Sequence, residues 1–111
     1  MATFNPQTFL KQVGKDNTTL KVPKKHVVFS QGDTPDAVFY VQVGKVKLTV
    51  VSPHGKEAVI VILEPGSFFG EGCLAGQPVH LATATTVEDA RIVRIDKQSM
   101  LRAHQDTFLG W

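Results

Sequence analysis

The chain has 111 residues, of which 42% are hydrophobic, and its 12 Lys and Arg residues against 10 Asp and Glu residues give a formal net charge of +2. This length fits one compact domain and is too short for two, and the hydrophobic fraction excludes a disordered chain. The near balance of charge gives no reason to expect a nucleic-acid or membrane surface as a partner. The single cysteine, Cys73, excludes an internal disulfide and is typical of a reducing compartment.

The sequence has no segment that is typical of a targeting peptide or of a membrane-spanning helix. Its first ten residues, MATFNPQTFL, lack the basic stretch and the long apolar run of a signal peptide. The longest apolar run, 58–63, is far shorter than the roughly 18 residues that a transmembrane helix needs. We therefore expect a cytoplasmic domain that does not enter a membrane.

The first predicted element is a short helix at 5–13. Asn5 suits the N-cap and Pro6 suits the first helical position. Beyond this helix, turn signals recur about every 8–12 residues, which is typical of a β-sandwich or a small barrel. These signals are QGD at 31–33, Gly44, SPHG at 52–55 and EPG at 64–66.

Between these turns lie runs of β-branched, aromatic and aliphatic residues, which predict strands. KVKLTVV at 45–51 alternates apolar and polar side chains, as a strand with one buried face does. EAVIVIL at 57–63 is almost continuously apolar, which predicts a strand that is covered on both faces. The predicted strands are 26–29, 37–43, 45–51, 57–63, 80–87 and 90–95.

The last predicted element is a helix at 96–105, for which Asp96 is a good N-cap. Taken together, the elements predict a mainly β fold in one domain over 1–111. We expect a β-roll over about 20–96, of the jelly-roll or double-stranded β-helix type, with a short α-helix flanking each end.

One stretch, FFGEGCLAGQPVHLATAT at 68–85, combines glycines with a lone Glu and a lone His. A phosphate site needs main-chain N–H donors that point at one spot, and glycines that allow a close approach. FGEGCLAG at 69–76 provides both if a strand there breaks into a short helical turn. Glu71 would then accept a hydrogen bond from a sugar hydroxyl. The stretch therefore predicts a bend that wraps a phosphate.

The motifs around this bend occur in a specific order. The QGD turn, VFYVQVGKVKL, PGSFFGE and a following AT resemble the cyclic-nucleotide-binding domain, especially the sensor half of bacterial CRP/FNR-type transcription regulators. The likeness runs from about Val22 to about Gln105. It implies a β-roll that binds a cyclic nucleotide, cAMP or cGMP, and requires no further cofactor. It also implies that DNA is bound only through a domain missing from this chain, and that the full-length form is a homodimer.

The resemblance implies roles for the residues of the phosphate-binding cassette, which would run from 69 to 83. The amide of Gly70 would approach the ligand, and the carboxylate of Glu71 would accept from the ribose 2′-hydroxyl. The main chain of Gly72 and Cys73 would line the sugar-phosphate pocket. Leu81 would add a further main-chain amide, and Ala82 follows it.

His80 stands where the family has an Arg that forks onto the exocyclic phosphate oxygens. Imidazole offers one donor to the same oxygen and is mostly neutral near pH 7, because its ordinary pKa is about 6.5. A lost charge-assisted hydrogen bond costs roughly 1.5–3 kcal/mol, and a buried charge that loses its partner costs roughly 2–5 kcal/mol. We therefore expect an affinity about one to three orders of magnitude weaker than that of a site with Arg.

Two other functions compete with ligand sensing. The same fold with a degenerate pocket would act as a structural or protein-interaction domain. Catalysis is disfavoured, because metal-binding β-roll enzymes (cupins) use a close His pair with a carboxylate, and the sequence has no H-x-H pair and no recognisable nucleophile motif. We expect no catalytic residue and no metal site among the four histidines, His26, His54, His80 and His104.

Overall fold

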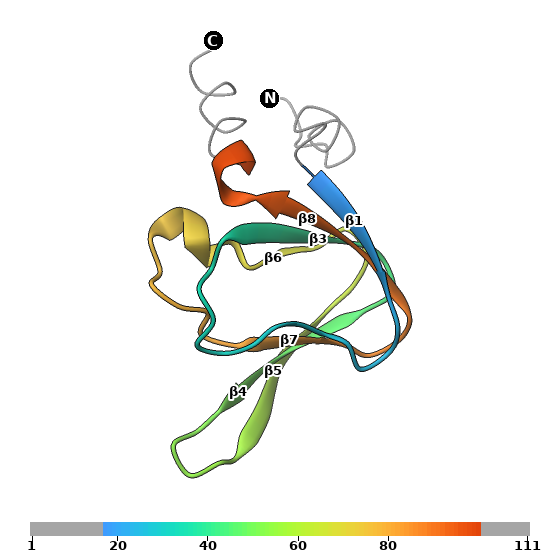
Figure 1. Ribbon diagram of the computed structural model, residues 1–111. Coiled ribbons are helices and arrows are strands. Elements are labelled where there is room, and N and C mark those ends of the chain that lie inside the picture. Colours follow the sequence, from blue (N-terminus) through green and yellow to red (C-terminus); the bar gives the residue numbers. More distant parts are fainter. Residues whose placement is uncertain (1–16, 101–111) are drawn as a thin grey trace, which may run out of the picture.

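The computed structural model describes residues 17–100. They form two four-stranded antiparallel sheets that face each other in a roll (Figure 1). One sheet has the order β1-β8-β3-β6 and the other has the order β2-β7-β4-β5. The elements are β1 (Asn17–Val22), β2 (Val27–Phe29), β3 (Ala37–Val43), β4 (Val46–Val51), β5 (Glu57–Leu63), β6 (Phe68–Phe69), the 3₁₀ helix η2 (Glu71–Ala75), β7 (Thr83–Thr86) and β8 (Ala90–Asp96). The prediction of a mainly β, jelly-roll-like domain is confirmed.

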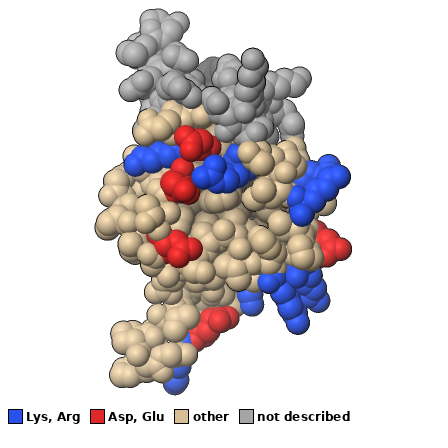
Figure 2. Space-filling view, in the orientation of Figure 1, with Lys and Arg blue, Asp and Glu red and all other residues tan. Residues whose placement is uncertain are grey.

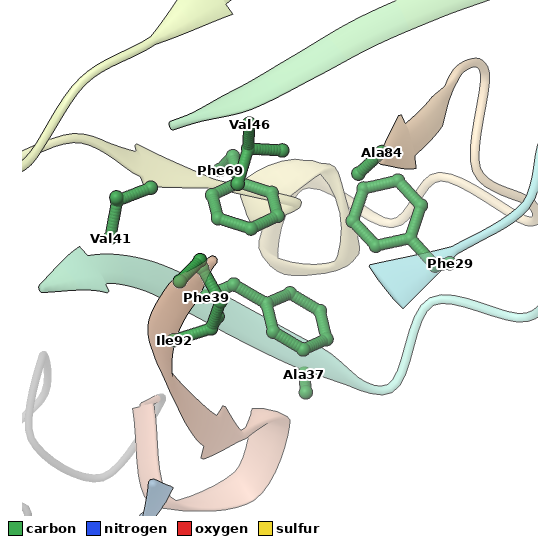
Figure 3. Packing of buried hydrophobic residues seen from close by; sticks show 9 residues of the cluster. Phe29, Ala37, Phe39, Val41, Val46, Phe69, Ala84 and Ile92 are labelled. Carbon is green, nitrogen blue, oxygen red and sulfur yellow. The ribbon is translucent and has the colours of Figure 1, made fainter. Parts of the chain in front are cut away.

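The core fills the space between the two sheets (Figure 3). Its centre is a group of three phenylalanine rings from β2, β3 and β6. The ring centroids of Phe39 and Phe69 are 5.3 Å apart, and those of Phe29 and Phe39 are 5.6 Å apart. Such offset and tilted pairs add to the stability that burial provides. Aliphatic side chains from both sheets close the cluster, among them Val41, Val46 and Ile92.

The predicted flanking helices lie largely beyond the described residues. The helix predicted at 5–13 falls entirely outside them. Residues 97–100 are helical, so the second predicted helix begins where expected, and its end lies outside the described part. The Gln98 N–H donates to Oδ2 of Asp96 at 3.1 Å, as an N-cap requires. Within 17–100, no helix has the length and apolarity needed to cross a bilayer.

The strand predictions need three corrections. β1 was not predicted, β6 was expected only as a strand that breaks into a turn within 69–76, and β7 spans Thr83–Thr86 instead of 80–87. β1 is polar in sequence and is a strand because all six of its residues pair with β8. The main-chain groups of His80 bond the turn at 31–33 instead of a neighbouring strand, so the stretch 80–82 is irregular.

The prediction that β5 is covered on both faces is wrong. Val59, Ile60 and Ile62 are 54%, 59% and 52% exposed. The reason is that the β4–β5 hairpin projects away from the roll, so the facing sheet does not cover most of β5 (Figure 1). β5 is also the last strand of its sheet and has only β4 beside it. Ile60 has no partner on β4, which marks a β-bulge in the middle of the hairpin.

Candidate functional site

The glycine-rich stretch forms the predicted strand-to-turn bend. β6 leads into Gly70, whose φ of 76° is left-handed, and η2 follows at once. A Cβ at Gly70 would lie 3.1 Å from Cδ2 of Phe39 and 3.3 Å from Cε2 of Phe29. Both the backbone angle and the close packing therefore require glycine. Gly76, with φ 79°, ends the turn in the same conformation.

A cavity of about 280 Å³ opens beside this bend. Its volume lies near the lower end of the range of ligand pockets. Phe29 of β2 and Leu48 of β4 form part of its wall, together with Ala75 and Gln77. The structure brings six of the seven predicted site residues to its lining. They are Gly70, Glu71, Gly72, His80, Leu81 and Ala82.

Cys73, the seventh predicted site residue, is not part of the cavity lining. Its side chain is 1% exposed, and its Sγ donates to the main-chain oxygen of Ala37 at 3.6 Å. Burial raises the pKa of the Cys73 thiol, which keeps it protonated near neutral pH. The thiol therefore attaches η2 to β3. The contact that the Cys73 main chain would make with a ligand stays a prediction.

His80 is both packed and part of the cavity wall. Its ring stacks on Phe29 with centroids 3.7 Å apart and an angle of 8° between the planes, and it is 6% exposed. Burial lowers the pKa of His80, while the carboxylates of Asp33 and Asp36 act in the opposite direction. The imidazole is therefore mostly neutral near pH 7.

The main chain of His80 is held by the turn that follows β2. The His80 N–H donates to the oxygen of Asp33, and the Gly32 N–H donates to the oxygen of His80, each at 2.8 Å. Asp33 also stabilises its own turn, because its Oδ2 accepts from the Ser30 N–H at 2.9 Å. These contacts fix the position of His80 more firmly than its ring stacking alone would.

Sequence reasoning missed four residues at or near the site. Gln77 packs its side-chain amide where a Cβ of Gly72 would lie, and its N–H donates to the Gly72 oxygen at 3.1 Å. Gln31, in the QGD turn, contacts both β4 and β7. Phe29 and Leu48 complete the wall from distant strands. The QGD motif was a visible signal for Gln31, but its partners lie far away in the chain and could not be predicted from it.

The charge at the cavity is small. Glu71 and His80 are the ionisable groups of its described lining, which has no Lys or Arg. Over residues 17–100, no cluster of three or more His, Cys, Asp or Glu side chains is arranged to hold a metal ion. On the face drawn in Figure 2, acidic and basic side chains are mixed over the roll, and most of the projecting hairpin belongs to neither class. An anion in the cavity would therefore depend mainly on main-chain donors.

Comparison with known proteins identifies the family of this chain. The family model described as "Cyclic nucleotide-binding domain" matches residues 19–107. The CRP-like cAMP-activated global transcriptional regulator of Mycobacterium tuberculosis is 31% identical over 78 residues, which cover 70% of this chain and 35% of that protein. The chain thus spans about a third of the length of that curated relative.

Solved structures agree with the sequence comparison. The Thermus thermophilus catabolite activator protein aligns with a TM-score of 0.83 at 27% identity, covering 95% of this chain and 49% of that one. The sensor domain of the regulator DNR from Pseudomonas aeruginosa aligns with a TM-score of 0.81 at 26% identity, covering 89% of this chain and 67% of that one. The chain therefore belongs to the cyclic nucleotide-binding domain family and resembles the sensor domains of CRP/FNR-family regulators.

Proposed function

We propose that this chain is a ligand-sensing module that binds a cyclic nucleotide weakly in the cavity beside η2. The observation that carries the proposal is that the cassette residues at 70–72 and 80–82 converge on one cavity with Phe29 and Leu48. Membership of the family supports the same ligand class. The Mycobacterium tuberculosis relative is described as cAMP-activated, which makes cAMP the first ligand to test.

The cassette offers the ligand main-chain donors and one carboxylate. A helical turn leaves its first N–H groups without partners inside the turn, and a phosphate would accept hydrogen bonds from such groups. The Gln77 side chain fills the space that a Cβ of Gly72 would take, so it would move aside for a phosphate that approaches Gly72 closely. Glu71, at the start of η2, would accept from the ribose 2′-hydroxyl. The amide of Leu81 would reach the same phosphate, and its side chain, 60% exposed, would cover the sugar or the base.

Binding is weak in this proposal because the site has no permanent cation. An Arg would offer two parallel charge-assisted bonds. The neutral imidazole of His80 offers one donor at most, and its ring is already stacked on Phe29. The expected loss is about one to three orders of magnitude in affinity, which moves a micromolar site toward the millimolar range.

Calorimetric titration with cAMP and with cGMP tests the proposal directly. We expect small heats that saturate only at high ligand concentration, together with a rise in the thermal unfolding temperature that grows with ligand concentration. If neither nucleotide gives heat or stabilisation at millimolar concentration, the proposal is wrong for the wild-type chain.

His80→Arg is the sharper experiment. If the pocket geometry is intact and only the cation is missing, this substitution raises the affinity by about tenfold or more. His54→Arg is the matched control, since it adds the same charge in the exposed turn between β4 and β5. An equal gain in both variants would indicate a general effect of net charge and would contradict the role assigned to residue 80. Thermal unfolding without ligand shows that each variant is folded.

A second candidate function is that of a structural or protein-interaction domain with a degenerate pocket. The stacking of His80 on Phe29 favours it, because the ring is packed inward instead of extending into the cavity. The exposed apolar side chains of β5 also favour it. In that case cAMP and cGMP stabilise neither the wild type nor the His80→Arg variant.

Further properties of the whole protein follow only from the resemblance. We propose that any DNA contact belongs to a separate domain, that two copies pair in the full-length form, and that the protein is cytoplasmic. We also propose that this domain binds and does not catalyse. Sedimentation of the full-length protein with and without cAMP would test the pairing, and a shift assay with DNA would compare it with the present chain.

A further inference from the structure

We propose that Gln31 is a positioning residue that couples the cassette to the outer part of the β4–β5 hairpin. The outer hairpin is defined here as residues 50–58. The coupling itself is argued from contacts within the chain. Only its response to a nucleotide rests on the proposed function. The turn at 31–33 carries the coupling, because it bonds three separate segments at once.

Gln31 joins β4 to β7. Its side-chain Oε1 accepts from the Val51 N–H at 2.9 Å, and its Nε2 donates to the Val51 oxygen at 3.5 Å. Its own main-chain N–H donates to Oγ1 of Thr83 at 2.9 Å. Val51 is the last residue of β4 and Thr83 is the first residue of β7. One residue thus links the far end of a hairpin strand to the strand that follows the cassette.

The next two residues of the same turn hold the cassette itself. Gly32 and Asp33 bond the main-chain oxygen and N–H of His80 at 2.8 Å each. A shift of His80, whose ring forms part of the cavity wall, therefore acts on the backbone beside Gln31. The path from the cavity to Val51 runs from His80 through its two main-chain hydrogen bonds to the turn, along the chain to Gln31, and through the Gln31 side chain to Val51.

The ladder between strands does not duplicate this link. β4 pairs with β7 from Val46 to Thr49, and the pairing ends at Thr49 opposite Thr83. Beyond Thr49, β4 pairs only with β5. Among the described residues, the hydrogen bonds that join the outer hairpin to another part of the roll are therefore those of Gln31. Together with the last ladder pair, Thr49 opposite Thr83, these bonds set the direction of the outer hairpin relative to the cassette.

Two variants isolate the side-chain link. Gln31→Glu keeps an oxygen that accepts from the Val51 N–H, while its second oxygen faces the Val51 oxygen in place of the longer bond. Gln31→Met has a similar length and keeps neither bond, while both variants retain the main-chain bond to Thr83. A hydrogen bond worth about 0.5–1.5 kcal/mol protects an amide roughly two- to tenfold. We expect the Met variant to lose that protection at Val51 in hydrogen exchange, and the Glu variant to retain it.

The Ser52 amide is the internal control, because it bonds Lys56 within the hairpin turn at 2.9 Å. Its exchange should stay the same in all variants. Faster exchange at both amides would mean that the Met variant loosens the whole hairpin, which would contradict a specific link through Gln31.

A double-mutant cycle tests the coupling without any nucleotide. His80→Ala perturbs the cassette, and we expect it to change exchange at Val51 in the wild type and in Gln31→Glu but not in Gln31→Met. His80→Phe, which keeps a ring on Phe29, replaces it if the Ala variant does not fold. An equal response at Val51 in the Met background, or no response in the wild type, would overturn the proposal.

The ligand-dependent part is measured separately. Where calorimetry detects cAMP, we expect cAMP to change exchange at Val51 in the wild type and not in Gln31→Met. If cAMP does not bind, the proposed function fails while the double-mutant cycle still decides the coupling. If cAMP binds and Val51 responds equally in both backgrounds, the coupling fails while the proposed function stands.

Discussion

β3 and β5 are both seven residues long and both rich in aliphatic side chains, yet they occupy opposite environments. β3 lies between β8 and β6, and Ala37, Val38 and Val41 on it have no exposed surface. β5 lies at the edge of the other sheet in a hairpin that leaves the roll, and its apolar side chains meet solvent. The burial of a strand is thus set by whether the other sheet covers its faces, which composition alone does not encode.

The two strands also differ in their relation to the candidate site. β3 supports the cassette directly, because Phe39 packs on Gly70 and the Ala37 oxygen accepts from the Cys73 thiol. β5 lies farther from the cassette, and its ladder partner β4 contacts the turn that contains Gln31. Substitutions in the two regions should therefore differ both in their energetic cost and in their effect on the site.

The largest difference should come from removing one large apolar side chain in each region. Phe39→Ala should lower the free energy of unfolding by about 3–5 kcal/mol, because it leaves a cavity among the Phe rings. Ile60→Ala, in the exposed bulge, should change it by about 0.5 kcal/mol or less. Urea unfolding at constant pH measures both. Similar costs would mean that β5 is covered in solution by something that the described residues do not provide.

A smaller difference should separate two glycines of similar backbone angle. Gly44 and Gly55 have φ of 86° and 82°, but a Cβ at Gly44 would lie 2.5 Å from the Asp89 oxygen, whereas a Cβ at Gly55 would meet nothing within 4 Å. Gly55→Ala should cost roughly 1–2 kcal/mol for the left-handed angle alone. Gly44→Ala should cost about 1–3 kcal/mol more because of the clash. Equal unfolding temperatures for the two variants would show that the Gly44 turn can relax.

The smallest effect should appear in the pH dependence that His80 gives to stability. Burial lowers the pKa of His80 in the folded chain, so the unfolded chain takes up a proton first as the pH falls. The contribution of His80 to stability is complete above the unfolded pKa of about 6.5 and declines below it. His80→Gln should therefore flatten the decrease in the free energy of unfolding between pH 8 and pH 5. Urea unfolding of the wild type and of His80→Gln at several pH values measures this change, and an equal decrease in both would contradict it.

Elements that carry their own local signals were predictable from sequence. The strands at 37–43 and 57–63 have the predicted bounds. Each is a run rich in β-branched residues, and turns that contain glycine delimit it. β1 has no such signal, since its residues NTTLKV are largely polar and become a strand only by pairing with β8, about seventy positions away. The start of β7 was also missed, because distant bonds from the QGD turn hold His80 outside the ladder.

The candidate site likewise contains residues that were predictable from sequence and residues that were not. Residues 70–72 and 80–82 were predicted because they belong to one continuous stretch with a recognisable order. Phe29, Leu48 and Gln31 come from other strands and turns, and their places at the site depend on how the two sheets meet. The sequence is compatible with two places for the His80 side chain, at the ligand or packed under the cassette, and the structure decides between them through the Phe29 ring, whose centroid lies 3.7 Å away.

The left-handed Gly70 has a consequence for engineering this domain. Its Cα lies against the same two rings, Phe39 and Phe29, that form the centre of the core. Any enlargement or rotation of those rings would redirect the chain as it enters η2. Substitutions that raise thermal stability and substitutions that tighten nucleotide binding would then affect the same few atoms. Variants improved in both properties would need changes elsewhere in the fold.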